Sequence, residues 1–187
     1  MSETNTNSET NATNETNATN EASDVRDTIR RVVTTHDADG KAVVHTDDQV
    51  LMADFPGASE WDARSAVLWT TGAVPADNAG DLVGGDRPSG ATLSGGSVLR
   101  VTELGPGFTS LMHRTLSIDY IAMLSGELEL ELDGGSVVRL RPGDVAVQRG
   151  TNHLWRNPSQ DTPCRFVVSM IESEPVLIDG QRLEQTM

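Results

Sequence analysis

The chain has few of the residues from which several common classes of protein are built. Its 187 residues include one cysteine, Cys164, which excludes an internal disulfide and any metal site made of several cysteines. Aromatic residues make up 4% of the sequence, so a buried core has to consist mainly of Val, Leu, Ile and Met. No apolar run approaches the roughly 20 residues that a membrane-spanning helix needs, and the N-terminus lacks the basic and apolar regions of a signal peptide. We therefore expect a cytoplasmic protein without a membrane partner.

Positive charge is also scarce. The formal net charge is −14, and Lys41 is the only lysine among 14 basic residues. Because binding to phosphates needs a basic surface, this composition predicts that nucleic acid is not a partner. Acid-rich, lysine-poor sequences are typical of salt-adapted proteins. A GC-rich genome combined with an acidic tail would give the same composition, so both explanations stay open.

Changes in composition along the chain predict its domain organisation. After Met1, residues 1–23 consist entirely of Ser, Thr, Asn, Glu and Ala, which cannot offset the entropy of ordering. We expect this segment to be a disordered acidic tail. Residues 24–96 are predicted to supply N-terminal strands and a covering loop. Residues 97–172 are predicted to form the main β-domain, and residues 173–187 a C-terminal extension.

Short runs of β-forming residues, separated by turn residues, predict the fold class. Two such runs flank residues 36–40 and predict a hairpin, whereas residues 75–96 are rich in Gly, Pro, Asp and Ser and predict a loop. Further strands are predicted at 97–104, 111–124, 127–132, 137–140, 145–148 and 165–171. Without an amphipathic helix between them, this series predicts an all-β sandwich or barrel.

Two stretches of this series carry residues with possible chemistry. The first contains, in order, Gly107, His113, Thr115, Asp119 and Gly126. Positions 113, 115 and 119 differ by even numbers, so on one strand their side chains would point to the same face. The second stretch contains, in order, Gly143, Gly150, His153, Trp155 and Asn157.

The spacing of these two stretches resembles the paired motifs of the cupin superfamily. The first stretch matches every spacing of the family pattern. In the second, Gln148 stands where the family usually has proline, and the segment before it is one residue shorter. The resemblance covers residues 97–172 and implies a double-stranded β-helix, the cupin jelly roll, with N-terminal strand extensions. Many cupins pair through N-terminal strands, so the resemblance also implies a homodimer.

The resemblance further implies candidate metal ligands at His113, Asp119 and His153. Thr115 occupies the fourth ligand position of the family and is a poor ligand for iron, manganese or zinc. Asp119 is shorter than the usual glutamate, which retracts its carboxylate by about 1.5 Å. If Asp119 reaches the ion, the set matches the two-histidine, one-carboxylate face of Fe(II) oxygenases. If it does not, the barrel is metal-free and the three groups form an acid–base set. A single divalent ion (Fe, Mn, Zn or Ni) and no metal both stay open.

The candidate catalytic residues are the same three. The predicted substrate pocket adds Thr115, Met123, Gln148 and Trp155, with the methionine and the tryptophan as apolar walls around a small-molecule ligand. These residues predict a small-molecule enzyme acting on an organic acid or an aromatic or polyketide-like substrate. A dioxygenase, a decarboxylase and a dehydratase or isomerase are the reaction classes considered. The alternative is a non-catalytic cupin that binds or senses a small molecule.

Overall fold

The computed structural model describes residues 28–55 and 62–186, and the predicted disordered tail lies outside them. The described residues form strands, turns and loops. Within these ranges there is no helix with the length and apolar character needed to cross a membrane. The chain divides into two compact units, Met1–Met52 and Ala53–Met187, which are described separately below.

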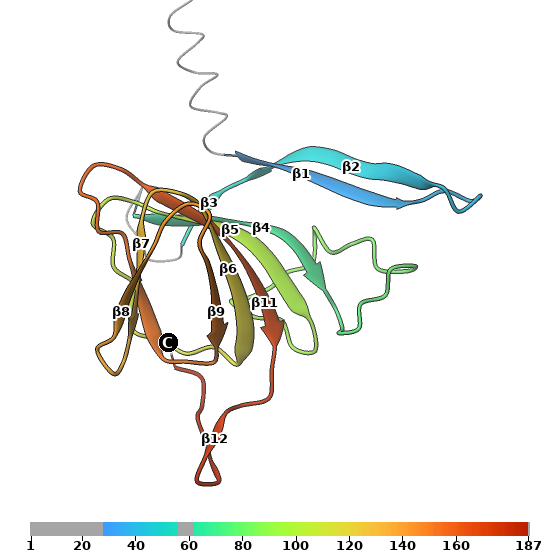
Figure 1. Cartoon of the computed structure of the whole chain (residues 1–187). Helices are drawn as coiled ribbons and strands as arrows, with labels where there is room; N and C mark the ends of the chain where they lie inside the picture. Colours follow the sequence, from blue (N-terminus) through green and yellow to red (C-terminus); the bar gives the residue numbers. More distant parts are fainter. Residues whose placement is uncertain (1–27, 56–61, 187) are drawn as a thin grey trace, which may run out of the picture. The chain divides into compact units, whose positions relative to one another are not determined.

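The described part of the first unit is an antiparallel hairpin (Figure 1). Strand β1 (Thr28–His36) pairs with strand β2 (Ala42–Leu51). The Asp37 carboxylate accepts hydrogen bonds from the amides of Asp39 and Lys41, at 3.0 and 2.9 Å, and so closes the connecting turn. The predicted hairpin is confirmed.

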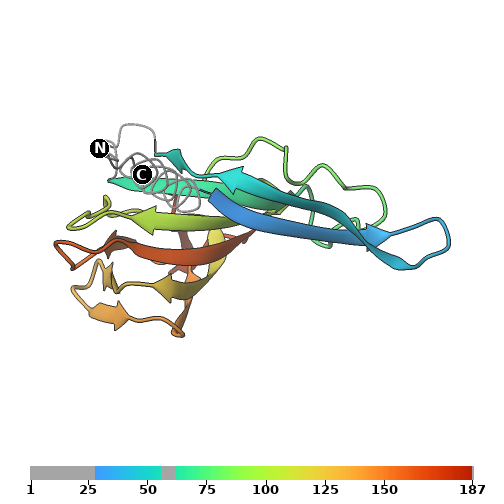
Figure 2. The same ribbon diagram turned by 90° about the horizontal axis from the view of Figure 1, so that it is seen from above.

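The second unit consists of two facing antiparallel sheets. The larger sheet has the strand order β3-β4-β5-β11-β6-β9, and Figure 2 shows β4 (teal), β5 (lime) and β11 (red) side by side. The strands of this sheet are β3 (Ala53–Asp54), β4 (Ala63–Thr71), β5 (Ser97–Leu104), β11 (Cys164–Glu172), β6 (Ser117–Ser125) and β9 (Val145–Arg149). The smaller sheet has the order β10-β7-β8 and consists of β10 (His153–Arg156), β7 (Leu128–Leu132) and β8 (Val137–Leu140). The predicted double-stranded β-helix is confirmed.

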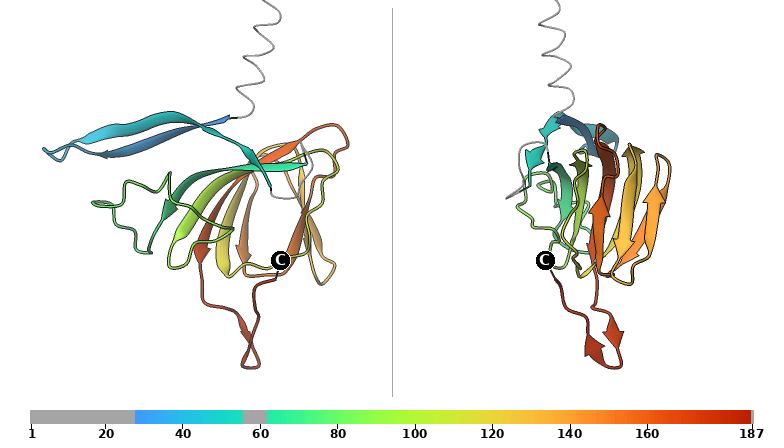
Figure 3. Two further views of the ribbon diagram at one scale, coloured as in Figure 1. Left: turned by 180° about the vertical axis from the view of Figure 1, so that it is seen from behind. Right: turned by 90° about the vertical axis from the view of Figure 1, so that its left-hand side faces the viewer.

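A short hairpin follows the last strand of the barrel. It is formed by β12 (Leu177–Ile178) and β13 (Gln181–Arg182) and projects away from the two sheets (Figure 3). This hairpin lies in the predicted C-terminal extension. The segment between β4 and β5 contains turns and no strand, which agrees with the loop predicted at residues 75–96.

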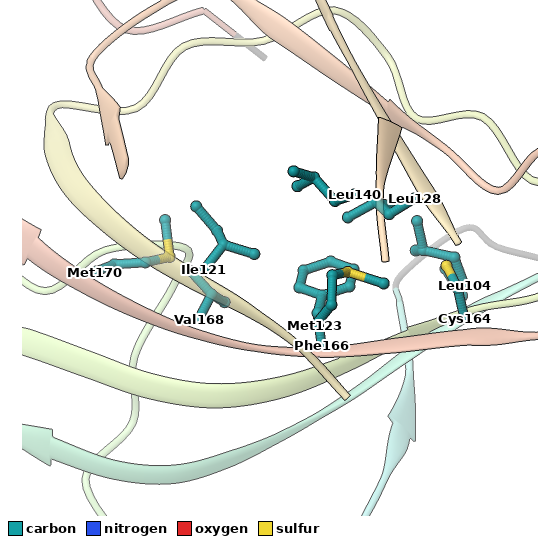
Figure 4. Close-up of a cluster of buried hydrophobic side chains, with 10 residues drawn as sticks. Leu104, Ile121, Met123, Leu128, Leu140, Cys164, Phe166, Val168 and Met170 are labelled. Carbon is teal, nitrogen blue, oxygen red and sulfur yellow. The ribbon is translucent and has the colours of Figure 1, made fainter. Parts of the chain in front are cut away.

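Apolar side chains from both sheets fill the space between them (Figure 4). The larger sheet contributes side chains such as Ile121 and Phe166, and the smaller sheet contributes Leu128 and Leu140. Burial alternates strictly along β11, so every second residue of this strand faces the cluster. Burial of each such large side chain contributes about 1.5–3 kcal/mol to the stability of the barrel.

The predicted strand at residues 111–124 is wrong in its first half. Strand β6 begins only at Ser117. Before it, the main chain of His113 makes two hydrogen bonds with that of His153, at 2.7 and 2.9 Å. Because β10 belongs to the smaller sheet and β6 to the larger one, the chain passes from one sheet to the other between His113 and Ser117. His113 therefore lies against β10, whereas Asp119 is carried by β6.

Candidate functional site

Polar side chains replace the apolar cluster at one end of the barrel interior. Asp119 on β6 lies opposite Gln148 on β9 and Met170 on β11. The next inward position along β6 is Ile121, which already belongs to the apolar cluster. Asp119 and Gln148 are 4% and 3% exposed, so both are buried polar groups that need partners.

Two imidazole rings lie next to this polar end. The ring centroids of His113 and His153 are 4.2 Å apart, with 50° between the ring planes. Nδ1 of His113 is 2.9 Å from the carbonyl oxygen of Leu111, and Nδ1 of His153 is 3.0 Å from that of Thr151. A carbonyl oxygen only accepts, so each Nδ1 carries the hydrogen and each neutral ring keeps a lone pair on Nε2.

The two histidines differ in what surrounds Nε2. His153 is buried, and the amide nitrogen of Gln148 lies 2.6 Å from its Nε2. Burial lowers the pKa of His153 to about 4, the Thr151 carbonyl opposes this shift, and the charge on His113 adds to it. His113 is half-buried, and within the described ranges no protein group bonds to its Nε2. His153 is therefore held neutral at pH 7, whereas Nε2 of His113 has no hydrogen-bond partner among the described residues.

Hydroxyl groups hold the carboxylate of Asp119. The Ser117 hydroxyl donates to Oδ1 of Asp119 at 2.6 Å and lies 2.8 Å from the hydroxyl oxygen of Thr115. Burial raises the pKa of Asp119, while these hydroxyls and the charges on His113 and Arg100 lower it in part. The carboxylate therefore lies within electrostatic reach of both a histidine and an arginine.

Arg100 and Ser117 are members of this polar group that the sequence did not predict. Ser117 had a usable signal, because it shares the even spacing of Thr115 and Asp119. Arg100 had none: an arginine within an apolar strand is ordinarily expected to point outward. In the structure Arg100 is 9% exposed and lies opposite Val168, on the inner face of β5.

Three of the four predicted pocket residues lie beside the histidine pair or Asp119. Thr115 contacts Ser117, and Gln148 contacts His153. Trp155 is half-buried, and its ring meets that of His153 edge-on, with the centroids 5.2 Å apart. The fourth, Met123, is buried within the apolar cluster (Figure 4).

Among the described residues the structure does not show an assembled metal site. Across residues 28–55 and 62–186, no group of three or more His, Cys, Asp or Glu side chains is placed to hold one. Nδ1 of each imidazole is hydrogen-bonded to a main-chain carbonyl oxygen, as is usual for metal-binding histidines. Protein metal sites of this kind use at least three protein ligands, and the third predicted ligand, Asp119, accepts a hydrogen bond from Ser117 at Oδ1. The predicted set of His113, Asp119 and His153 is thus not assembled as a three-ligand site.

Several known proteins are similar to this chain. The family model described as "Cupin domain" matches residues 100–170. Phomopsin biosynthesis cluster protein C' of Diaporthe leptostromiformis is 45% identical over 161 residues, which cover 83% of this chain and 85% of that protein. The cupin-domain-containing oxidoreductase srdB of Neurospora crassa is 34% identical over 161 residues, covering 84% of this chain and 80% of that protein. The crystal structure of Rru_A2000 from Rhodospirillum rubrum, a cupin-2 domain, is 18% identical, with a TM-score of 0.45 and coverage of 74% of each chain.

Proposed function

The chain belongs to the cupin superfamily, and on that premise we propose that it is a small-molecule enzyme that works by proton transfer at His113. The observation that carries the proposal is the histidine pair. Both Nδ1 atoms are tied to main-chain carbonyls, His153 is neutral, and Nε2 of His113 is open to a ligand. Relatives named for biosynthesis clusters and as oxidoreductases support an enzyme of small-molecule metabolism.

The proposed step removes a proton from a carbon atom next to a carbonyl group of an organic acid or a polyketide-like substrate. Nε2 of His113 takes the proton, the C–H bond breaks, and its electron pair moves into the carbonyl to form an enolate. Return of the proton to another atom gives isomerisation. Dehydration results when the enolate electrons form a C=C bond, the C–O bond at the β-carbon breaks, and the imidazolium of His113 gives its proton to the leaving hydroxyl group, which departs as water. The negative charge of Asp119 stabilises the imidazolium formed at His113. Because His153 stays neutral, it does not oppose this positive charge.

Two other interpretations stay distinct from this proposal. One is an oxidoreductase, as some relatives are named, with one divalent ion such as Fe, Mn, Zn or Ni as its cofactor. In this chain His113, Asp119 and His153 would be the residues to hold the ion. The other interpretation is a cupin that binds a small molecule without converting it. The homodimer and the cytoplasmic location also remain predictions.

Hydrogen–deuterium exchange tests the proposed step directly. The protein, purified without chelators, is incubated in D₂O with pyruvate, acetoacetate and acetylacetone, and loss of the α-proton signal is followed by NMR. We expect the wild type to accelerate exchange for at least one probe and His113→Gln to slow it by about 100-fold, the usual contribution of a general base. His45→Gln is the matched control, since His45 lies exposed on β2.

Elemental analysis of the same samples separates the alternatives. Stoichiometric metal in the wild type that is lost in His113→Gln, together with exchange that depends on that metal, would contradict a metal-free acid–base site. Binding of a probe without any acceleration of its exchange would favour the non-catalytic module.

A further inference from the structure

Arg100 is a buried arginine on the inner face of the larger sheet. Along β5 it shares the inner face with Val98 and Thr102, which are also buried. It lies opposite Val168 of β11. Only 9% of Arg100 is exposed. Since a guanidinium does not lose its proton at neutral pH, the strand holds a positive charge inside the barrel.

The protein uses only part of this guanidinium. Nη2 donates to the carbonyl oxygens of Gly90 and Ala91, at 2.6 and 3.2 Å. Nε is buried, and in the part of the chain that the structure describes it has no hydrogen-bond acceptor. In the same part of the chain, Arg100 forms no ion pair with a carboxylate. The nearby charge of Asp119 acts on Arg100 without pairing with it directly. Burying a charge that has no direct partner is costly, so its retention needs a reason.

The outer face of the same strand shows the usual arrangement. There Glu103 of β5 lies between Arg64 of β4 and Arg165 of β11, with nitrogen–oxygen distances of 2.7 and 2.6 Å. Those arginines therefore have a carboxylate partner from a neighbouring strand. Arg100 lacks one, although it is more deeply placed.

We propose that Arg100 binds a carboxylate group of the substrate, and hence that the enzyme acts on organic acids. This deepens the proposed function and rests on it. The planar guanidinium fork matches the geometry of a carboxylate, and its unused Nε–H supplies a donor for the ligand. Arg100 lies opposite Val168 and Asp119 lies opposite Met170, which are consecutive inward positions of β11, so the two charged groups share one part of the inner face. A substrate held by its carboxylate at Arg100 would lie at this part of the inner face.

A purely structural role would give Arg100 a different property. In that case its function is to fasten the loop at Gly90 and Ala91, for which the two Nη2 bonds suffice. The loop bonds do not use Nε and do not require an anion. The two roles therefore differ in whether a carboxylate ligand changes the state of Nε.

Binding of benzoate and of its neutral amide, benzamide, to the full-length protein tests the proposal by isothermal titration calorimetry. We expect the wild type to bind benzoate at least tenfold more tightly than benzamide. Arg100→Gln should remove this preference and Arg100→Lys should retain part of it. Arg141→Gln, which removes a charge from an exposed arginine paired with Glu127, should leave the preference unchanged. In the ¹⁵N–¹H spectrum of the wild type, benzoate should shift the Arg100 Nε–H signal and benzamide should not.

The result that overturns the proposal is equal binding of the two probes by the wild type, or benzoate binding that survives in folded Arg100→Gln. If Arg100→Gln does not fold, the wild-type preference and the Nε–H shift decide the question without it. His113→Gln keeps the two proposals apart. It should bind benzoate as the wild type does while losing proton exchange. If the proton-transfer proposal fails, the carboxylate site can therefore still be correct, and if the carboxylate site fails, the proton-transfer proposal can still be correct.

Discussion

Two buried amide side chains, Asn157 and Gln148, differ in how completely the protein uses their polar atoms. Asn157 donates to the carbonyl oxygens of Leu104, Gly105 and Thr162 at 2.9–3.1 Å, and its Oδ1 accepts from the amide of Ser159 at 3.0 Å. Asn157 is 1% exposed, and both of its polar atoms have partners. It joins the end of β5 to the turn before β11.

Gln148 is as deeply buried but leaves an atom unused. Its amide nitrogen lies against the ring of His153, whereas its Oε1 is buried and, in the described chain, unpaired. Arg100 has a similar unused Nε, and Nε2 of His113 has no protein partner among the residues described. Unpaired buried polar atoms are uncommon in native proteins. Arg100 and Gln148 both lie on the larger sheet, where each keeps an unpaired buried atom, whereas both polar atoms of Asn157 are used.

The largest loss of stability is expected on substitution of Asn157, because both of its polar atoms have hydrogen-bond partners. Asn157→Ala removes the hydrogen bonds of two amide hydrogens, shared among three carbonyl oxygens, and of one amide oxygen. At roughly 1 kcal/mol for each of these three groups, the free energy of unfolding should fall by about 3 kcal/mol. Urea unfolding followed by circular dichroism measures this change. Asn152→Ala is the control, since Asn152 is half-buried and its side chain makes one long bond, 3.3 Å, to Thr186. Equal losses in the two variants would contradict a structural role for Asn157.

The sequence predicted most strands because local patterns determine them. Leucines alternate with Glu129 and Glu131 along β7, and in the structure these glutamates pair with Arg139 and Arg156 at 2.6 and 2.8 Å. The glycine of the first motif is likewise explained locally. Gly126 has a φ of 70°, and a Cβ there would lie 2.7 Å from Cα of Cys164, so a larger residue does not fit.

The parts that failed depend on contacts between distant strands. The spacing of His113 and Asp119 suggested one continuous strand, yet each lies against a different sheet. Arg100 was missed because the twist and closure of the barrel, which place β5 beside β11, decide which face of β5 is buried. The even-spacing rule did predict the inward position of Asp119, and applied to every residue it would have included Ser117. Whether an inward polar residue has a partner cannot be predicted from spacing.

Acid should destabilise the wild-type protein more than a variant that lacks His153. The pKa of His153 falls from 6.5 in the unfolded chain to about 4 in the folded protein. Between these values the unfolded state binds more protons, so stability is fully present above pH 6.5 and is lost as the pH falls toward 4. This loss amounts to at most about 3 kcal/mol, at 1.36 kcal/mol per pKa unit.

Comparison of the wild type with His153→Gln isolates this contribution. The raised pKa of Asp119 acts in the opposite direction, because its protonated form is favoured in the folded state and its contribution is lost as the pH rises. Asp119 is present in both proteins, so its contribution cancels in the difference. Urea unfolding at pH 4.5, 5.5 and 7 should show a steeper loss of stability in the wild type. Parallel curves would mean that His153 is not held neutral by the fold.

The smallest loss of stability is expected on substitution of Gln148, whose Oε1 has no hydrogen-bond partner among the described residues. Gln148→Leu removes the contacts of its amide nitrogen with the ring nitrogens of His153 but also removes the buried Oε1, which is unpaired among the described residues, and these two changes offset each other. The free energy of unfolding should therefore change by less than about 1 kcal/mol. Asn157→Leu is the matched substitution at the fully bonded amide and should lose several times as much. Equal losses would show that Gln148 fastens the barrel as Asn157 does, and the contrast between the two amides would then no longer hold.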